Sequence, residues 1–209
     1  MINILYIHGL GSSDQSNTGR LLHSLSDNEM TFYNPSFSLS PKKAMEEINQ
    51  FIKDKHIDVV IGSSLGGFYA LESDCPFGVV INPALTPIDD LKKSIGLGEH
   101  KYVHSDDTYI IDDSFLNELE WIIRRHYKEK DINRWFVSLK DSKYFGGIFG
   151  NKDELFSHYD DFHLINSSLV ILLGDMGHRF DPKYLPILMD FLNEIIKTKN
   201  KTITKNNNN

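Results

Sequence analysis

The stretch VIGSSLGGFYAL, residues 60–71, places a serine between two glycines directly after a run of β-branched residues. Ser64 has Gly62 and Gly66 two positions to either side, the G-x-S-x-G pattern of a nucleophile on a sharp strand-to-helix turn. On such a turn, the two flanking positions approach neighbouring backbone too closely to carry a Cβ. Ser63 lacks this pair of glycines. The pattern favours Ser64 as a nucleophile; the alternative is a glycine-rich turn that binds a phosphate or nothing.

A serine hydroxyl becomes a useful nucleophile when a base takes its proton and a carboxylate orients that base. In this setting the chain order is serine, acid, histidine, so the base should follow Ser64. His178 lies in LVILLGDMGHRF, between the last apolar run and the last helical pattern. We expect that loop at the carboxyl edge of a sheet, where ligands and chemistry gather, and we therefore predict His178 as the base. His126 continues an apolar helical face, and we expect His158 and His163 to be solvated.

The acid is expected after the strand that precedes the loop of His178. There the run YFGGIFG ends in a turn glycine and the sequence NKDEL, which contains Asp153 and Glu154. Asp153 is the leading candidate, and Glu154 and Asp175 remain alternatives. Asp175 is only three residues from His178, and such closeness favours a local hydrogen bond over a contact between two strand ends.

Backbone amides that would stabilise a developing oxyanion are expected after two of the strands. One is the N–H of Leu65, at the start of the helix that follows Ser64, where amides point outward. The second should come from the sequence HGLG after the first apolar run, with Leu10 favoured and Gly11 next. His8 precedes the serine in the chain, and we expect it to pack this loop rather than act as a base.

Six short apolar runs predict the strands that position these side chains. They lie at 2–7, 30–33, 57–62, 78–82, 143–150 and 168–173. Most are continuous rather than alternating, which is typical of strands covered on both faces. Helical patterns begin after Ser40-Pro41 and after Asp181-Pro182, where a serine or an aspartate precedes a proline at the first helical position. The sequence therefore predicts an α/β fold, with a mostly parallel central sheet flanked by helices.

The segment 86–143 interrupts this alternation of strand and helix. It contains an amphipathic pattern at 113–127, a weaker one near 87–95, and RWFVSL at 134–139, which fits either a short strand or a packed loop. Two interpretations stay open: crossover helices of the sheet, or a helical cap over a pocket at its carboxyl edge. A cap would decide which substrates reach the site.

The composition bounds the domain organisation. A chain of 209 residues that is 40% hydrophobic can bury one sizeable core. The sequence TKNKTITKNNNN at the end cannot bury enough apolar surface to order itself, so we predict a disordered tail over 198–209. A single domain over 1–197 remains. The sequence carries no signal for an oligomeric state.

Charge and motif content exclude several classes of protein. The 22 basic and 29 acidic residues give a net charge of −7, which argues against binding to nucleic-acid backbones. Cys75, the single cysteine, is expected to be a small buried side chain. No apolar run approaches the roughly 18 residues of a membrane span, and MINILYIHG lacks the basic region of a signal peptide. We expect a cytoplasmic protein without metal or cofactor, since neither metal-ligand spacing nor G-x-G-x-x-G appears.

Together, the sequences HGLGSS, GSSLGG, GNKDEL and GDMGHRF resemble those of α/β-hydrolases, and most closely the small bacterial YqiA-like esterase family. The resemblance covers about 1–85 and 144–196. It is weak over 86–143, where YKEKDINRWFVSLKDS looks longer than the usual connection of the family. This difference bears on the size of the substrate rather than on the chemistry.

The resemblance implies a serine esterase that acts on short acyl esters through an acyl-enzyme intermediate, without a cofactor. The nucleophile of the family corresponds to Ser64, its acid to Asp153 and its base to His178. A thioesterase, an amidase or an acyltransferase would use the same triad. A binding protein without turnover would keep the same fold.

Overall fold

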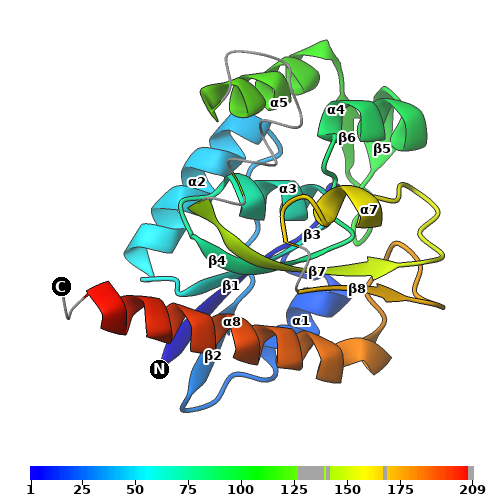
Figure 1. Ribbon diagram of the computed structural model, residues 1–209. Helices are drawn as coiled ribbons and strands as arrows, with labels where there is room; N and C mark the ends of the chain where they lie inside the picture. The colour runs from blue at the N-terminus through cyan, green and yellow to red at the C-terminus, as the bar shows by residue number, and fades with distance from the viewer. Residues whose placement is uncertain (127–138, 140–141, 167–168, 207–209) are drawn as a thin grey trace.

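Six parallel strands form the central sheet of the computed structural model, which describes residues 1–126, 139, 142–166 and 169–206 (Figure 1). The strands are β1 (Ile2–Ile7), β2 (Met30–Tyr33), β3 (Val59–Ser63), β4 (Phe77–Ile81), β7 (Tyr144–Gly150) and β8 (Val170–Leu173). Their order across the sheet is β2-β1-β3-β4-β7-β8, and every neighbouring pair is parallel. The predicted fold class is confirmed, and each strand lies within two residues of its predicted position.

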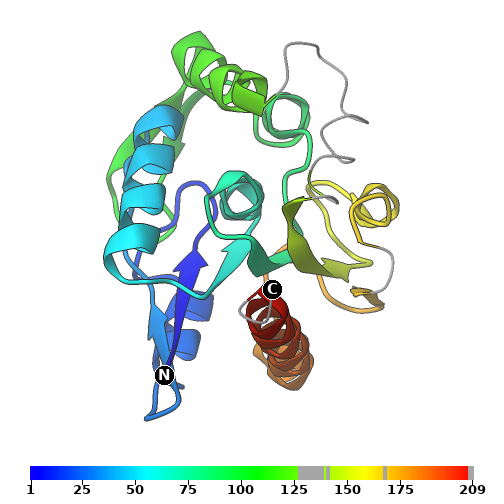
Figure 2. The same cartoon turned by 60° about the vertical axis from the view of Figure 1, so that its left-hand side comes forward.

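Helices cover both faces of the sheet, as the continuous apolar strands require. One face packs against α2 (Pro41–Asp54) and α3 (Leu65–Glu72), and the other packs against α1 (Asn17–His23) and α8 (Leu185–Asn206) (Figures 1 and 2). In β1, the side chains of Leu5 and Ile7 belong to the first core, whereas those of Ile4 and Tyr6 belong to the second. All four side chains are buried, so the strand has no polar face to expose.

Helix α2 begins where the sequence predicts. The Ser40 hydroxyl accepts a hydrogen bond from the Lys43 N–H at 3.3 Å, and Pro41 occupies the first turn. The buried face of the helix comprises Pro41, Ala44, Met45, Ile48 and Ile52. The Ser40 hydroxyl also donates to the Glu118 carboxylate at 2.5 Å, which ties the start of α2 to α5 (Asp113–His126).

The described part of 86–143 is a mixed segment rather than a purely helical cap. It contains α4 (Pro87–Asp90), a π-helical turn η1 (Leu91–Ile95), an antiparallel hairpin of β5 (Gly98–Lys101) and β6 (Thr108–Ile111), and α5. The sequence did not predict the hairpin, because GEHK in β5 is polar and largely exposed and leaves no apolar alternation to detect. The stretch RWFVSL falls outside the described residues, except for its last residue.

This segment lies at the carboxyl edge of the sheet. The Val103 N–H in the hairpin donates to the Gly11 carbonyl, in the loop after β1, at 2.8 Å. The Ser94 hydroxyl donates to the Leu155 carbonyl, in the loop after β7. Because these loops follow the carboxyl ends of parallel strands, the segment covers part of the edge where the predicted site residues gather.

Helix α8 continues to Asn206, into the region that the composition predicted to be disordered. Lys199 extends from the helix to the Asp58 carboxylate just before β3, at 2.5 Å, which anchors the extension to the body of the protein. The Thr202 and Thr204 hydroxyls donate to carbonyls one turn earlier in the helix. None of the helices in the described ranges is both long and apolar enough to cross a membrane.

Candidate active site

Ser64 occupies a strained turn between β3 and α3. Its backbone has φ 55° and ψ −125°, a conformation that L-residues rarely adopt. A Cβ at Gly62 would lie 2.3 Å from the Gly66 carbonyl oxygen, and a Cβ at Gly66 would lie 2.2 Å from the Ile7 carbonyl oxygen. Close backbone approach on both sides of the turn therefore accounts for the pair of glycines.

The neighbouring strand β4 holds this turn in place. The Ser64 N–H donates to the Ile81 carbonyl at 3.1 Å, and the Ser64 carbonyl accepts from the Ala84 N–H at 3.0 Å. Ser63 is the last residue of β3, and its hydroxyl instead bonds to Tyr6, in the core that faces α1 and α8. The structure thus separates the two serines: Ser63 serves packing, and Ser64 is held by the strained turn.

His178 and Asp153 meet across the ends of β7 and β8. The His178 Nδ1 lies 2.9 Å and 3.0 Å from the two carboxylate oxygens of Asp153. The Asp153 carboxylate also accepts from the N–H groups of Leu155 and Phe156, and its side chain is only 2% exposed. Because carboxylate oxygens accept hydrogen bonds, this contact favours the tautomer with the proton on Nδ1, which directs Nε2 towards base chemistry.

The alternative acids have other partners. The Asp175 carboxylate is exposed and accepts from the Lys183 ammonium at 2.6 Å. The Glu154 carboxylate accepts from the backbone N–H of His178 at 3.0 Å, and this hydrogen bond holds the pKa of Glu154 below its usual range. Glu154 therefore fixes the backbone of the histidine loop, while Asp153 faces the imidazole.

Asn82, which is not among the predicted site residues, ties the candidate site together. Its side-chain amide donates to the carbonyls of Gly177 and His178 at 2.9 Å and 2.8 Å, and its side-chain oxygen accepts from the Gly150 N–H at 2.8 Å. The residue is 2% exposed, and its backbone has φ 42°. One buried side chain thus joins the loops that follow β4, β7 and β8. A polar residue before a proline at the end of the run GVVIN was the available signal.

No hydrogen bond joins the Ser64 hydroxyl to His178 in the part of the chain that the structure describes. Both residues nevertheless contact the same short segment at the end of β4. Ser64 bonds to Ile81 and Ala84, and the side chain of Asn82, which lies between these two in the sequence, bonds to the His178 carbonyl. Such hydrogen bonds are often long in enzymes without substrate and tighten when it binds.

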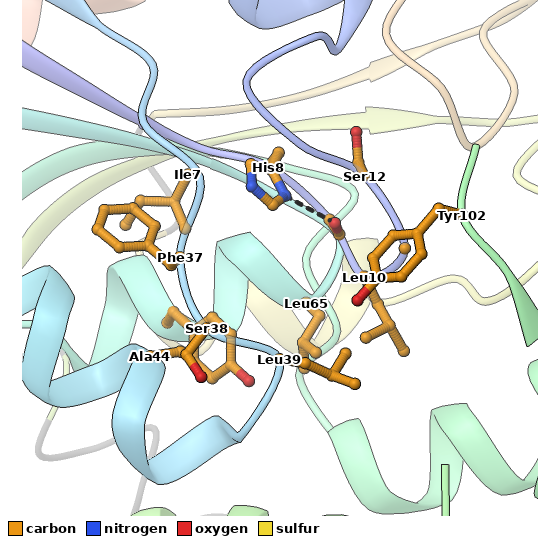
Figure 3. A pocket seen from close by; sticks show the side chains of 13 residues that line it. Ile7, His8, Leu10, Ser12, Phe37, Ser38, Leu39, Ala44, Leu65 and Tyr102 are labelled. Atoms are coloured by element: carbon orange, nitrogen blue, oxygen red, sulfur yellow. Dashed lines mark hydrogen bonds between the residues drawn. The ribbon is translucent and has the colours of Figure 1, made fainter. Parts of the chain in front are cut away.

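The predicted amide donors flank a small cavity. Leu65 is the first residue of α3, Leu10 lies in the loop after β1, and neither N–H has an acceptor among the residues described. The same holds for the N–H of Gly11, the second candidate in that loop. Leu10, Gly11 and Leu65 all line a cavity of about 50 Å³ (Figure 3). Amides without acceptors beside a cavity are free to bind an oxygen of a substrate.

His8 packs within the same loop. Its Nδ1 lies 3.0 Å from the Gly9 carbonyl oxygen, and burial lowers its pKa below the ordinary value for histidine. Its Nε2 is buried and has no hydrogen-bond partner within the described ranges. His8 is therefore neutral near pH 7.

His158 corrects an expectation, because it is buried rather than solvated. Its Nε2 lies 3.0 Å from both carboxylate oxygens of Asp90 in α4, and its Nδ1 lies 2.9 Å from the Asp161 carboxylate. Burial is the largest single influence and acts to lower the pKa of His158, but the two carboxylates together outweigh it and raise the pKa. The Phe156 ring packs near both histidines: its centroid lies 5.6 Å from that of the His158 ring and 4.8 Å from that of the His178 ring. The Asp90 contact spans 68 positions in the chain, so no local pattern could reveal it.

Across the residues described, no group of three or more His, Cys, Asp or Glu side chains is arranged to hold a metal ion. Cys75 is buried, and burial raises the pKa of its thiol, which keeps it protonated.

Known proteins share this fold. Alpha/beta hydrolase domain-containing protein 10 from mouse is 16% identical, with a TM-score of 0.64 over 94% of this chain and 90% of that chain. Est1E from Butyrivibrio proteoclasticus is 12% identical, with a TM-score of 0.63 over 95% and 88%. The monoacylglycerol lipase of Paleococcus ferrophilus is 15% identical, with a TM-score of 0.58 over 94% and 93%. At these identities the likeness shows the fold.

Sequence similarity, in addition to the shared fold, shows to which family the chain belongs. Residues 3–192 match the family described as "Uncharacterised protein family (UPF0227)", which spans nearly all of the sheet, the strained turn and the loops of Asp153 and His178. The match agrees with the resemblance to YqiA-like proteins that the four motifs indicate. The chain therefore belongs to the UPF0227 family and has the α/β-hydrolase fold.

Proposed function

We propose that this protein is a serine hydrolase that cleaves carboxylic esters of small acyl groups through Ser64, His178 and Asp153. The observation that carries the proposal is the buried Asp153–His178 pair, at 2.9 Å, on the same sheet edge as the strained turn of Ser64. Solved structures of the same fold include proteins named as carboxylesterases and lipases, which supports ester hydrolysis as the reaction class.

In the first half of the reaction, the Ser64 Oγ attacks the ester carbonyl while the His178 Nε2 takes the hydroxyl proton. The carbonyl oxygen becomes an oxyanion, which the N–H groups of Leu65 and Leu10 stabilise by roughly 3 kcal/mol each. Asp153 holds the imidazole in the required tautomer and stabilises the imidazolium. The bond between the carbonyl carbon and the alkoxy oxygen then breaks, and His178 protonates the departing alcohol.

In the second half, water replaces the alcohol. His178 takes a proton from the water as its oxygen attacks the acyl-enzyme carbonyl, and the same two amides stabilise the second oxyanion. Collapse of this intermediate breaks the bond to Ser64, His178 returns the proton to the Ser64 oxygen, and the carboxylic acid leaves. The cycle consumes one ester and one water and needs no cofactor.

A fluorophosphonate probe tests the nucleophile directly. We expect one adduct per chain, mapped to Ser64 by peptide mass spectrometry, and no adduct in Ser64→Ala. Ser63→Ala makes the same chemical change one residue away and should label like the wild type. Labelling that persists in Ser64→Ala would overturn the assignment.

A substrate panel tests the reaction class. Oxygen esters, thioesters and amides of one acyl group, assayed on wild type and Ser64→Ala, separate an esterase from the related acyl-transfer enzymes. We expect oxygen esters to give the highest kcat/KM. A folded wild-type protein that neither hydrolyses the panel nor reacts with the probe would instead indicate a binding protein that keeps the fold without turnover.

A further inference from the structure

The cavity beside Leu10 and Leu65 has walls from three separate parts of the chain (Figure 3). The loop after β1 and the start of α3 supply Leu10 and Leu65, whose amides are the candidate oxyanion donors. The loop between β2 and α2 supplies Leu39, and the β5–β6 hairpin supplies Tyr102. In Figure 3, the side chains of Leu10, Leu39 and Leu65 converge and the Tyr102 ring lies beside Leu10. The lining at this end is therefore apolar.

The cavity begins next to the candidate nucleophile. Gly9 lines it, and a Cβ built on Gly9 would lie 3.1 Å from the Ser64 Cβ and 3.6 Å from the Ser64 Oγ. An acyl carbon attached to Ser64, with its carbonyl oxygen on the two amides, would thus stand at the mouth of the cavity.

The strand order decides which half of an ester enters. Ser64 follows β3, and the cavity lies on the side of β1 and β2. His178 follows β8, which lies on the other side of β3 in the strand order. No residue of the loops after β7 and β8 is among the described residues that line the cavity. Because His178 must protonate the leaving alcohol, the alcohol lies on the side of His178, and the acyl chain lies on the other side.

The volume limits the length of the acyl chain. A water-sized group needs roughly 10–15 Å³ of such volume. The cavity of about 50 Å³ therefore holds about three to five non-hydrogen atoms beyond the carbonyl carbon.

We propose that this cavity is the acyl pocket of the enzyme, that it selects unbranched acyl groups of roughly four to six carbons, and that Leu39 and Tyr102 form the part of its wall that limits the acyl chain. The inference rests on the proposed function of Ser64. Leu39 and Tyr102 are the residues to vary, because both are partly buried against the core and neither supplies a proposed catalytic group.

Two ester series measure the pocket. In the first, 4-nitrophenol is constant and the acyl group runs from acetyl to decanoyl; in the second, butanoyl is constant and the alcohol grows from methanol to hexanol. For the wild type, we expect kcat/KM to peak between butanoyl and hexanoyl and to fall at least about tenfold by decanoyl. A buried methylene contributes about fourfold to affinity, so an acyl chain that outgrows the cavity loses this gain at each step.

Leu39→Ala removes three carbons from the wall and should raise the ratio of kcat/KM for octanoyl over butanoyl about tenfold or more. Its alcohol series should change less than about twofold. Leu164→Ala makes the same change at a leucine that is 52% exposed and does not line the cavity, and it should behave like the wild type. Tyr102→Ala enlarges the cavity from the hairpin and carries the test if melting curves show that Leu39→Ala is unfolded.

The outcomes distinguish a failure of the acyl-pocket assignment from a failure of the proposed ester hydrolysis. A wild-type optimum at octanoyl or longer overturns the acyl pocket, as does an acyl profile that a folded Leu39→Ala or Tyr102→Ala leaves unchanged. A shift in the alcohol series instead of the acyl series overturns the assignment of sides. In each of these cases hydrolysis through Ser64 still stands, whereas the absence of both ester hydrolysis and fluorophosphonate labelling refutes the proposed function itself.

Discussion

The two halves of the candidate site are built in different ways. The turn of Ser64 is held by backbone: glycines at 62 and 66 admit close neighbours, and backbone hydrogen bonds tie the turn to β4. The half that carries His178 is held by side chains, since Asp153, Glu154 and Asn82 all bond to the histidine or to its loop. Backbone packing tolerates almost no added volume, whereas a network of side chains responds to changes in charge and hydrogen bonding.

The largest effect should come from the carboxylate that faces the imidazole. Asp153→Asn keeps the shape but favours the wrong tautomer of His178, so kcat should fall by about 10⁴-fold while KM changes little. Asp175→Asn is the matched control, because that carboxylate bonds to Lys183 at the surface, and its kcat should stay within about twofold. A large loss in Asp175→Asn with Asp153→Asn near wild type would reverse the assignment of the acid.

Substitutions in the turn of Ser64, the half of the site held by backbone, should lower the stability of the protein and not only its activity. In Gly66→Ala, the added methyl group would lie 2.2 Å from the Ile7 carbonyl oxygen, and rigid backbone must move to admit it. We expect a loss of about 3 kcal/mol or more in the free energy of unfolding, measured by denaturant titration. Gly174→Ala, which has open space around its Cβ position, should be nearly neutral. Equal stability of both variants would contradict the steric account of the turn.

Asn82→Asp probes the side-chain network in a nearly isosteric way. It would turn a carboxylate oxygen towards the Gly177 and His178 carbonyls, which now accept from the Asn82 amide. Losing two buried hydrogen bonds should lower kcat by roughly 10- to 100-fold in the folded variant, and KM should move less. Asn151→Asp changes an exposed residue and serves as the control.

That comparison distinguishes two roles of Asn82: positioning His178 for catalysis, or only stabilising the fold. If Asn82 only supports the fold, Asn82→Asp will lower the melting temperature and leave kcat and its pH profile intact. A shifted acidic limb of the kcat profile would show that the side chain acts through His178.

The smallest effect should come from the contact of His158 with Asp90 and Asp161. Folding raises the pKa of His158, so the folded protein binds this proton more tightly than the unfolded chain. The resulting stabilisation is complete below about pH 6.5 and is lost as the pH rises through the higher pKa of the folded state. We expect about 1–2 kcal/mol, read from unfolding free energies between about pH 6 and 9. His158→Gln should lack this pH-dependent component, and an identical pH dependence in both proteins would refute it.

Much of the site followed from sequence because its physical basis is local. A Cβ excluded by a sharp turn leaves a glycine, so Gly62 and Gly66 single out Ser64 without knowledge of the fold. Continuous apolar runs mark strands with two covered faces, and the carboxyl ends of parallel strands share one edge. These rules were enough to bring Asp153 and His178 to the same edge.

Only the tertiary structure decided the features of the site and the fold that depend on residues far apart in the sequence. Asn82 gains its role from Gly150 and His178, and His158 is buried because Asp90 meets it from 68 positions away. The polar hairpin strand β5 has no apolar pattern of its own and is held by its pairing with β6. The cavity likewise draws its walls from residues that lie far apart in the chain, among them Leu39, Leu65 and Tyr102. Steric and periodic constraints act between residues a few positions apart, whereas burial and hydrogen-bond partners are fixed when the chain closes on itself.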